Sequence, residues 1–409
     1  MTTVRVEALG PSGDGLCRVD GRWMHVPGAL PGEVVTLGGD GAPAVLEASP
    51  ERVAPPCPRF GVCGGCAWQH ASASLQASAH LALLQRALPP EVRALPVSWH
   101  PSPAPYGYRS RARLAWDARG PALLLGFRAR RSQDLVPADP CPVLDERIQK
   151  AAKEIGQFVR KIGDQGELSL ALGRSGRVVC SLHPQVAVTA ELVEELSALL
   201  GGGLEGVALG APGASAPITV GDPRPAQRGA DGELLLLPPD GFAQANEGLN
   251  GALVALVARR AEARGRKVLE LHAGSGNFTL ALAREAAAVC AVESDLGAVK
   301  ALEENLRARA QKGVTVLRGM AEDAVRGHPA EVVVLDPPRT GAREVCEALL
   351  KGRAKRVVYV SCDPPTLGRD LQVLLGGFRV EHLDAFEMFP QTPHLECVVT
   401  LLRKPRARW

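Results

Sequence analysis

The stretch from Lys267 to Phe278, KVLELHAGSGNF, decides the fold that we expect for the C-terminal part of the chain. An apolar run leads into a glycine-containing turn, and helix-forming residues follow, which is typical of a strand that enters a helix. The pattern returns in four more stretches: VCAVESD at 289–295, VTVLRGM at 314–320, EVVVLDPPR at 331–339 and RVVYVSCDPP at 356–365. Apolar strands that alternate with helices predict an α/β domain, in which helices cover both faces of a parallel sheet.

The end of the chain breaks this alternation. FRVEHLDAF at 378–386 and LECVVTLLRK at 395–404 are typical of strands, and the segment between them is too short for a crossover helix. A parallel connection needs such a crossover, so we expect the last strand to run antiparallel to its neighbours.

The residues before this region predict two further domains. Residues 1 to about 50 predict a small β-barrel, because short β segments alternate with Gly, Pro and Asp turns at Val4 to Leu9, Trp23 to Val26, Val34 to Leu37 and Ala44 to Ala48. Helices are predicted from Ser72 to Leu88 and from Asp145 to Lys161, among strands and glycine-rich connections. We therefore expect a β-barrel over 1–50, an α+β domain over 51–235 and the α/β domain over 236–409.

Length and composition limit the classes of protein that this chain can be. Its 409 residues suit two or three domains, and 46% hydrophobic with 22% charged residues excludes a disordered or fibrous chain. The formal charge of +3 is too small to identify a polyanionic partner by itself. No stretch reaches the roughly 18 apolar residues of a membrane span, and the first residues lack the apolar core of a secretory leader. We expect a cytoplasmic protein with no membrane partner.

A candidate nucleotide site lies where the first two strands of the α/β domain end. Gly274 and Gly276 lie in the turn after the first strand, where missing side chains let a ligand approach the backbone. Glu293 ends the second strand, seventeen residues after Gly276, and a carboxylate at that spacing can accept hydrogen bonds from ribose hydroxyls. The pair favours an adenosine-type ligand over a plain tight turn. The full GxGxxG of a pyrophosphate site is missing, which argues against NAD.

Four more reactive side chains are expected at the same edge of the sheet. Asp336 ends the fourth strand and Cys362 the fifth, whereas His394 and Glu396 stand at the entrance of the last strand. Taken singly, each has a plainer interpretation: a turn aspartate, a small buried cysteine, a packed imidazole or a solvated carboxylate. Their convergence on one edge favours an active site with Cys362 as nucleophile and Glu396 or His394 as base.

The cysteines at 57, 63 and 66 form a cluster in a segment rich in glycine and proline, and Cys141 follows later in ADPCPVLD. Three cysteines so close together in a chain expected to be cytoplasmic indicate a metal site. Four thiolates can hold a [4Fe-4S] cluster or tetrahedral zinc, and the spacing alone leaves both open.

A basic stretch at 106–131, YGYRSRARLAWDARGPALLLGFRARR, holds seven Arg and one Asp together with four aromatic residues. Arginine binds phosphates, and aromatic rings can stack on unpaired bases, so the stretch suits RNA. The alternative is a solvated basic strand pair whose aromatic residues lie in the core.

Several of these motifs together resemble the RNA 5-methyluridine methyltransferases, the class I S-adenosylmethionine-dependent family that modifies uridine in transfer or ribosomal RNA. GDGLCRVDGRWMHVPGALPGE is similar to the family's TRAM domain, FAQAN to its FxQxN motif and ELHAGSGNF to its cofactor loop. SCDPPTLGRDL resembles SCNPxTLxRDL, and FPQTPHLE matches the segment that carries the family's base. The resemblance covers nearly the whole chain.

The resemblance implies a Rossmann-like methyltransferase domain and a role for each matching residue. Cys362 would be the nucleophile and Glu396 the base, while S-adenosylmethionine would be bound by Gln244, His272, Gly274, Gly276, Asn277, Glu293 and Asp336. Asn246 would support Gln244. The cysteines Cys57, Cys63, Cys66 and Cys141 would ligate a [4Fe-4S] cluster, so the resemblance favours iron over zinc.

The chain departs from the family pattern at His272, Ala273, Met320 and Asp363, and these departures bear on cofactor affinity. The expected activity is methylation of uridine C5 in rRNA or tRNA through a covalent adduct between cysteine and C6, by a protein expected to be a monomer. Two alternatives remain: methylation of another RNA base at cytosine C5 or an exocyclic nitrogen, or a non-catalytic RNA-binding protein with an iron-sulfur cluster.

Overall fold

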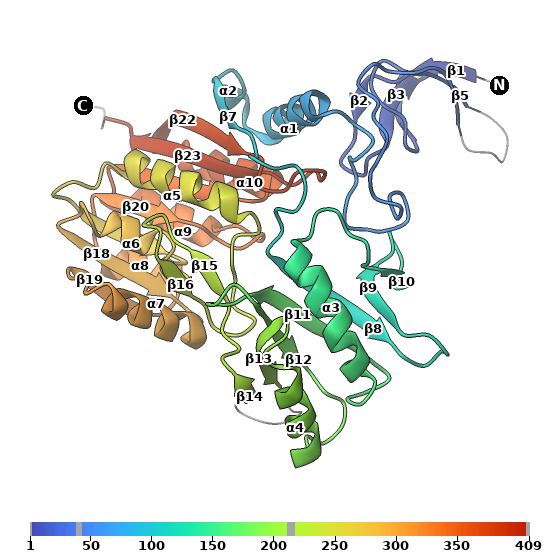
Figure 1. The fold of residues 1–409 in the computed structure, drawn as a ribbon. Helices are drawn as coiled ribbons and strands as arrows, with labels where there is room; N and C mark the ends of the chain where they lie inside the picture. The colour runs from blue at the N-terminus through green and yellow to red at the C-terminus, as the bar shows by residue number, and fades with distance from the viewer. Residues whose placement is uncertain (1, 38–42, 211–216, 406–409) are drawn as a thin grey trace.

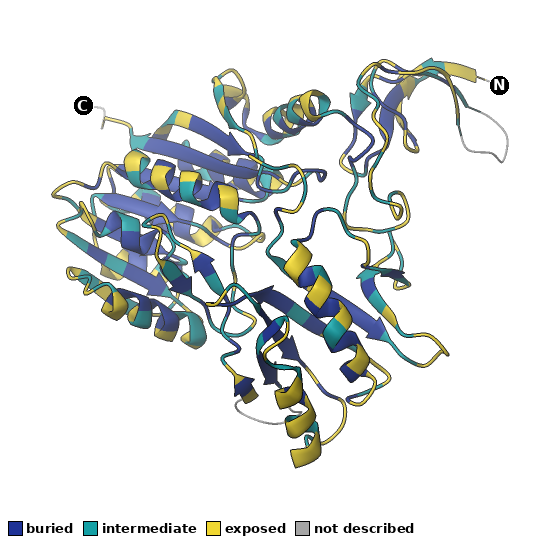
Figure 2. Cartoon of the chain, in the orientation of Figure 1, coloured by how far each residue is buried: buried dark blue, intermediate teal, exposed yellow. Residues whose placement is uncertain are grey.

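A computed structural model of the chain describes residues 2–37, 43–210 and 217–405. Two small N-terminal sheets, a central sheet with two helices and a large mixed sheet with helices on both faces follow one another along the chain (Figure 1). In the large C-terminal sheet most strands are deeply buried, whereas the helices that cover it turn one face to solvent (Figure 2). Among the described residues, every helix is too short or too polar to span a lipid bilayer.

The N-terminal part pairs its strands in the orders β1-β5-β6 and β2-β3-β4, around a core that includes Val6, Cys17 and Val35. The strands are β1 (Thr2–Arg5), β2 (Ala8–Leu9), β3 (Gly15–Val19), β4 (Arg22–Val26), β5 (Val34–Leu37) and β6 (Ala44–Glu47). The prediction of a small barrel-like unit is confirmed. The predicted single segment from Val4 to Leu9 divides into β1 and β2. β3 was not predicted, because a short strand that begins with glycine and lies beside a polar turn has no clear strand pattern.

The segment after this unit contains α1 (Ala73–Ala87), α2 (Pro90–Arg93) and β7 (Val97–His100). The predicted helix is confirmed: the Ser72 hydroxyl caps α1 by accepting a hydrogen bond from the Leu75 amide at 3.1 Å. β7 pairs in parallel with β22 (Phe378–Phe386), at the edge of the C-terminal sheet, so an early piece of chain completes a sheet made almost entirely from the last third.

The central sheet has the order β10-β9-β8-β11-β12-β13-β14, with two helices packed against it. Its elements are β8 (Arg111–Asp117), β9 (Leu124–Arg128), β10 (Leu135–Pro137), α3 (Glu146–Val159), β11 (Gln165–Leu172), β12 (Val178–Leu182), α4 (Ala190–Leu199), β13 (Leu204–Leu209) and β14 (Ile218–Gly221). The predicted second helix is α3, capped by Asp145. The hairpin of β15 (Ala226–Arg228) and β16 (Leu234–Leu236) then leads to the last unit.

The C-terminal sheet has the order β19-β18-β17-β20-β21-β23-β22-β7. Its strands are β17 (Lys267–Leu271), β18 (Ala288–Glu293), β19 (Val314–Arg318), β20 (Val332–Leu335), β21 (Arg356–Ser361), β22 and β23 (Glu396–Arg403). The first five are parallel, and β23 is antiparallel to both β21 and β22, so both predictions are confirmed.

Helices cover both faces of this sheet, as predicted. One face carries α5 (Glu247–Ala261), α6 (Thr279–Leu282) and α7 (Leu296–Ala308), and the other carries α8 (Ala321–Gly327), α9 (Arg343–Lys351) and α10 (Pro364–Leu374). Alternate residues of each strand supply the two cores: Val332 and Val334 face α5, whereas Val333 and Leu335 face α9.

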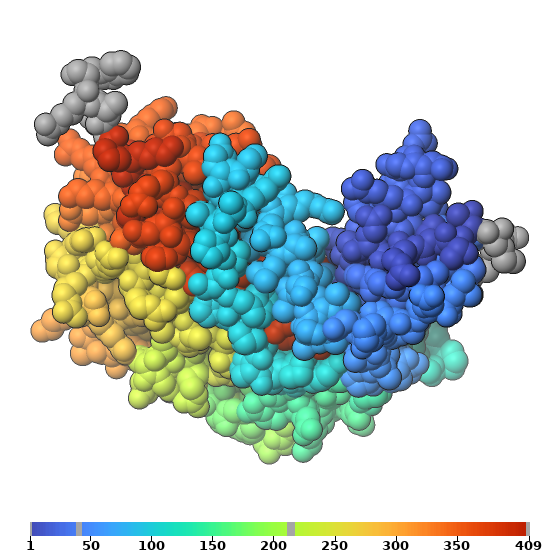
Figure 3. All heavy atoms as spheres, turned by 90° about the horizontal axis from the view of Figure 1, so that it is seen from above, coloured from blue at the N-terminus to red at the C-terminus, as the bar shows by residue number. Residues whose placement is uncertain are grey.

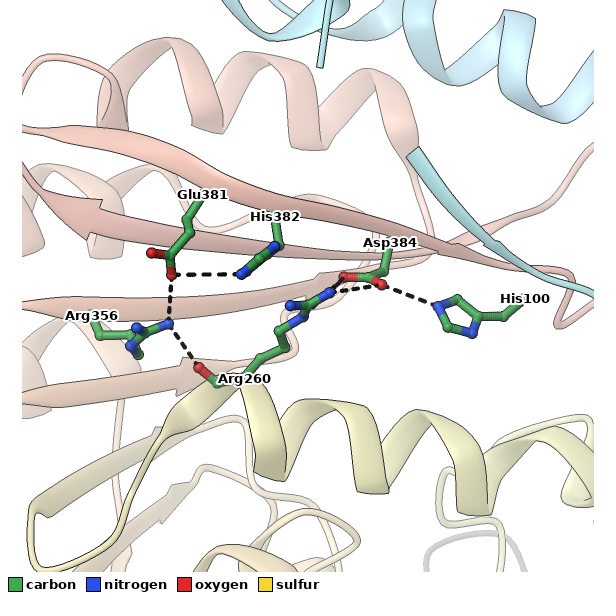
Figure 4. A network of polar contacts seen from close by, with 6 residues as sticks. All are labelled: His100, Arg260, Arg356, Glu381, His382 and Asp384. Carbon is green, nitrogen blue, oxygen red and sulfur yellow. Dashed lines mark hydrogen bonds and ion pairs between the residues drawn. The ribbon is translucent and has the colours of Figure 1, made fainter. Parts of the chain in front are cut away.

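A buried polar network joins α5 to the β22–β7 edge of this sheet (Figure 4). The Asp384 carboxylate, 1% exposed, accepts hydrogen bonds from Arg260 at 3.0 to 3.2 Å and contacts His100 Nε2 at 3.1 Å. Beside it, Arg356 pairs with Glu381 at 2.9 Å and with Glu262 at 2.7 Å. The network ties β7 to elements that come far later in the chain.

We expect Asp384→Ala to destabilise the protein by about 3 to 5 kcal/mol, because it leaves the largely buried Arg260 guanidinium without its partner. Urea unfolding should show the loss as a lower midpoint. The matched control is Glu331→Ala, which breaks an ion pair with Lys355 at the surface and should leave the midpoint nearly unchanged. Equal midpoints for Asp384→Ala and the unmodified protein would show that the network does not stabilise the fold.

Candidate active site

The sheet places the predicted nucleophile and base at neighbouring positions of two adjacent strands. Ser361 pairs with Cys397 across β21 and β23, so the next residue on each strand brings Cys362 beside Glu396. Because β23 is antiparallel, its first residue lies at the edge where the parallel strands end. Asp336 follows β20, the strand on the other side of β21, and completes a group of three reactive side chains.

The surroundings of Cys362 favour its neutral thiol. Burial, together with the nearby Glu396 and Asp336 carboxyls, raises the pKa of Cys362 to about 11, although Arg339 opposes them through its charge and a hydrogen bond to the sulfur. Reactivity requires the thiolate, so Cys362 needs the positive charge of Arg339 to favour its ionised form. Arg339 was not among the predicted site residues, although it stands next to the proline pair of the DPPR motif.

Thr366 holds the two loops that carry Cys362 and Arg339 against each other. Its hydroxyl lies 3.0 Å from the carbonyl oxygen of Arg339 and 2.8 Å from a carboxylate oxygen of Asp363, the residue after Cys362. A hydroxyl has one hydrogen, so it bonds one of these oxygens at a time. Asp363, where the family has Asn, therefore takes a structural partner within its own turn.

The two carboxyls of the site hold protons more tightly than ordinary acids do. Burial and the charge of Asp336 raise the pKa of Glu396 well above its usual range, and burial raises the pKa of Asp336 to about 7. Glu396 is 2% exposed, and its Oε1 has no hydrogen-bond partner among the described residues. A carboxylate with a raised pKa is a stronger base, which suits proton abstraction near neutral pH.

We expect the alkylation rate of Cys362 by iodoacetamide to rise about tenfold per pH unit between pH 7 and pH 10, because only the thiolate reacts and the pKa of Cys362 is about 11. Arg339→Met should slow the reaction at each pH by raising that pKa further. Peptide mass spectrometry can follow the site, with the half-buried Cys290 as the internal control that this variant leaves unchanged. A pH-independent rate would contradict this description of the site.

The cofactor loop follows β17 as predicted. Gln244, His272, Gly274, Asn277 and Asp336 line one cavity between this loop and the segment before α5. Gly274 and Gly276 have φ angles of +55° and +99°, and a Cβ at Gly276 would lie 2.5 Å from Leu302. The positive φ therefore favours glycine at Gly276, and a side chain there would also require Leu302 to shift.

Two of the predicted cofactor residues, Glu293 and Asn277, also hold the loop itself. Glu293 accepts a hydrogen bond from the Gly274 amide at 2.9 Å, and its other oxygen accepts from the amides of Ser294 and Asp295. Asn277 exchanges amide hydrogen bonds with Asn250 of α5 at 2.9 and 3.0 Å. His272 has a positive φ of 59°, and burial lowers its pKa, so its imidazole is neutral. Asn246, the expected support of Gln244, caps α5.

The four cysteines Cys57, Cys63, Cys66 and Cys141 line one cavity of about 490 Å³. Burial raises the pKa of Cys66 to about 11, and it raises that of Cys63 and Cys141 as well. Backbone amides approach the sulfurs, for example that of Gly65 at 3.4 Å from Cys63 Sγ. Within residues 2–37, 43–210 and 217–405, however, no three Cys, His, Asp or Glu side chains lie close enough to hold one metal ion.

Several arginines of the basic stretch at 106–131 lie around the cysteine cavity, and some of them are paired with carboxylates. Arg109, Arg113, Arg128, Arg130 and Arg131 line the same cavity as the cysteines. Arg113 and Arg128 pair with Glu167, and Arg130 pairs with Asp14.

Of the aromatic residues in that stretch, Tyr108 and Trp116 are buried and hydrogen-bonded to the carbonyls of Pro390 and Gly163. The prediction that these two rings stack on RNA bases is therefore wrong, because both rings belong to the core. The other two aromatic residues of the stretch, Tyr106 and Phe127, are partly exposed.

Comparison with known proteins identifies the family of this chain. Residues 236–404 match the family described as tRNA (Uracil-5-)-methyltransferase, and residues 2–37 match the TRAM domain. The chain is 36% identical to the 23S rRNA (uracil(1939)-C(5))-methyltransferase RlmD of Enterobacter sp. (strain 638), covering 97% of this chain and 95% of that protein. The enzyme of the same name from Pseudomonas putida is also 36% identical, over 96% of this chain and 92% of the relative.

A solved structure shows the same fold. It is that of the Pyrococcus abyssi tRNA (uracil-54, C5)-methyltransferase in complex with S-adenosyl-L-homocysteine, with a TM-score of 0.78, 23% identity, and coverage of 98% of this chain and 100% of the other. The strand order of this chain and its match to nearly the whole length of these relatives indicate the same family. The chain therefore belongs to the S-adenosylmethionine-dependent RNA 5-methyluridine methyltransferases and transfers a methyl group to uracil C5 in RNA.

Proposed function

We propose that this enzyme methylates one uridine of ribosomal RNA through a covalent adduct between Cys362 Sγ and C6 of the uracil. The observation that carries the chemistry is the register of β21 and β23, which sets Cys362 beside Glu396. The choice of ribosomal RNA rests on the relatives, whose names specify 23S rRNA and which match nearly the whole chain. Such a substrate fits the expected cytoplasmic location, and we propose that the enzyme acts there as a monomer.

Uracil C5 is a poor nucleophile, so the reaction must begin by making it richer in electrons. The Cys362 thiolate adds to C6, and the electron pair of the C5–C6 double bond moves toward C5 and the O4 carbonyl. Arg339 lies beside the sulfur and stabilises the thiolate before the attack. When bound, S-adenosylmethionine supplies the electrophilic methyl group that C5 receives.

Glu396 completes the reaction. Its carboxylate takes the proton from C5, the double bond to C6 forms again, and the bond from C6 to sulfur breaks with the thiolate as leaving group. Burial protects the base from water, and burial together with the charge of Asp336 keeps the pKa of Glu396 high enough for it to hold that proton. Gln244, His272, Gly274, Gly276, Asn277, Glu293 and Asp336 are proposed to bind the methionine and adenosine parts of the cofactor, five of them from one cavity.

RNA binding is assigned to the arginines around the cysteine cavity and to the N-terminal sheets. Arg131 and Arg109 have no ion-pair partner among the described residues, so they are available to phosphates. The target base must leave its stack to reach Cys362, and contacts to the neighbouring backbone would hold the RNA while it does so.

We also propose that Cys57, Cys63, Cys66 and Cys141 ligate a [4Fe-4S] cluster. Four thiols around one roomy cavity, approached by backbone amides, suit such a cluster. Zinc would need all four sulfurs about 2.3 Å from one point, and the described residues include no such close group. The cluster would join the loop at 57–66 to Cys141 of the central domain and take no part in the chemistry.

The covalent step is tested with RNA that carries 5-fluorouridine, because fluorine cannot leave C5 as a proton does. Incubation with S-adenosylmethionine should give a stable protein–RNA adduct on a denaturing gel, and Cys362→Ala should give none. An adduct that survives this change would refute the assignment of Cys362. Parallel reactions with 23S rRNA fragments and transfer RNA separate the two substrate classes, and preference for transfer RNA would overturn the ribosomal proposal.

The cluster is tested on protein purified without oxygen. Four iron atoms per chain with a brown absorption band are expected, and Cys63→Ser should lower the iron content and weaken RNA binding. Stoichiometric zinc in place of iron would contradict the proposal.

A further inference from the structure

The loop at 387–395 joins β22 to β23 and leads directly into Glu396. Its internal polar contacts are short-range: the Thr392 hydroxyl donates to the Phe389 carbonyl at 2.8 Å, and the His394 amide lies 3.2 Å from the same hydroxyl. These bonds close small turns and do not anchor the loop to the sheet. Glu387, at the start of the loop, donates its amide to the His100 carbonyl of β7 at 2.9 Å, and beyond that residue the position of the loop depends on what packs around it.

The N-terminal half of the chain holds three consecutive carbonyl groups of this loop. The amides of Ala67 and Trp68 both donate to the Gln391 carbonyl at 3.0 Å. The Tyr108 hydroxyl donates to the Pro390 carbonyl at 3.0 Å, and His80 Nε2 lies 2.8 Å from the Thr392 carbonyl. Seen from above, red atoms from the end of the chain are enclosed by blue and teal atoms of the first half (Figure 3).

A pair of buried glutamines makes the most specific of these contacts. Gln76 of α1 donates to the Gln391 side chain at 2.9 Å, and its own side-chain oxygen accepts from the Gln391 amide at 3.0 Å. Both residues are buried, and Gln391 has a φ of +70°, a conformation that glutamine rarely adopts. Such a backbone persists only where its surroundings determine it, and here both its amide and its carbonyl are bound.

The same segment carries the cysteines. Ala67 directly follows Cys66, and the Gln69 side chain accepts a hydrogen bond from the Cys57 amide at 3.2 Å. Thr392 lines the cavity that the four cysteines surround. A movement of Cys66 would pass to its neighbour Ala67 and, through the hydrogen bond of the Ala67 amide, to the Gln391 carbonyl. Glu396 lies five residues after Gln391 in the same loop and strand.

We propose that Gln76 and Gln391 form a latch through which the cysteine segment positions Glu396. The two glutamines are positioning residues, since neither touches the reacting atoms. The inference rests on the proposed function, in which Glu396 takes the C5 proton while the C6–sulfur bond breaks and the Cys362 thiolate leaves. The latch thus sets the rate of release from the adduct, and methyl transfer itself does not depend on it.

The test uses unmodified RNA and two variants, Gln76→Leu and Gln391→Gly. Gln76→Leu removes both contacts with Gln391 and also the bonds of Gln76 to the Trp68 and Ala71 carbonyls. Gln391→Gly keeps the left-handed backbone and removes only the Gln391 side chain, so it is the more selective variant. We expect each to lower multiple-turnover kcat by roughly tenfold or more and to accumulate a methylated protein–RNA adduct on denaturing gels. Single-turnover methyl transfer to RNA should stay within about twofold of the unmodified enzyme, and iron content should not change.

The matched control is Gln311→Leu, which removes a glutamine that bonds the Ala283 and Lys312 carbonyls away from the site, and it should accumulate no adduct. Glu396→Gln serves as the reference for a stalled release. If Glu396→Gln accumulates the adduct and the latch variants do not, the latch is refuted and the proposed function stands. If Glu396→Gln accumulates no adduct, the proposed role of Glu396 in removing the C5 proton is refuted, and the latch is refuted with it. Loss of methyl transfer in Gln391→Gly would likewise refute the inference.

Discussion

Cys362→Ala should lower kcat by roughly 10⁴-fold or more, the largest effect that we expect of any substitution in this enzyme. Without the sulfur no bond to C6 can form, and C5 keeps too little electron density to attack a methyl group. The residues proposed to bind RNA and cofactor remain, so affinity for both should change little. Single-turnover transfer of a radiolabelled methyl group measures the loss.

The control for this experiment is Cys346→Ala in α9, a buried cysteine in the core beneath the sheet. It should cost some stability through lost packing and leave the rate of methyl transfer unchanged. A Cys362→Ala enzyme that still forms 5-methyluridine at a comparable rate would rule out the covalent mechanism. Cys362→Ser should behave like the alanine variant, because a serine hydroxyl is a far weaker nucleophile than a thiolate at neutral pH.

Glu396→Gln should lower multiple-turnover kcat by roughly 10²- to 10⁴-fold while the methylated adduct accumulates. Glutamine fills the same space but cannot accept the C5 proton, so the reaction stops after methyl transfer with the sulfur still bound to C6. The adduct should be visible with ordinary uridine RNA, with no fluorine needed. If the variant releases product at the normal rate, another base acts, and His394 is the residue to examine next.

The same substitution should make the protein more stable above neutral pH. The pKa values of Glu396 and Asp336 are raised in the folded state, so between about pH 4 and those values the folded protein binds more protons than the unfolded chain. Stability therefore falls as pH rises through this window and stays low above it. Glu396→Gln removes one of the two carboxyls, and its melting temperature should fall less between pH 5 and pH 9 than that of the unmodified enzyme.

Local sequence patterns predicted the C-terminal sheet well because each strand there is an apolar run with its own turn signal. The glycine turn at 274–276, Glu293, Asp336 and Cys362 each end a strand, and parallel strands end at one edge, so their convergence could be predicted. The division of the chain at residues 50 and 235 stays a prediction, as do the individual roles of the site residues.

What could not be predicted depends on contacts between distant parts of the chain. The pairing of β7 with β22 could not be predicted from the sequence of either strand, because the four residues of β7 carry too little pattern to identify a partner. Arg339 gains importance only because its loop lies against that of Cys362, and Gln391 because its carbonyl faces Ala67. Tyr108 and Trp116 were assigned to RNA because composition cannot tell an aromatic ring in the core from one at the surface.

The place of β7 affects how this protein can be made and dissected. During synthesis β7 leaves the ribosome before the entire central sheet, and it stays unpaired until β22 emerges. A fragment that starts after residue 100 would lack this outer strand and present the bare amide and carbonyl groups of β22 to other copies, which invites precipitation. No single cut therefore separates a complete catalytic unit from the rest, and a two-piece enzyme would need its early strand supplied as a second polypeptide.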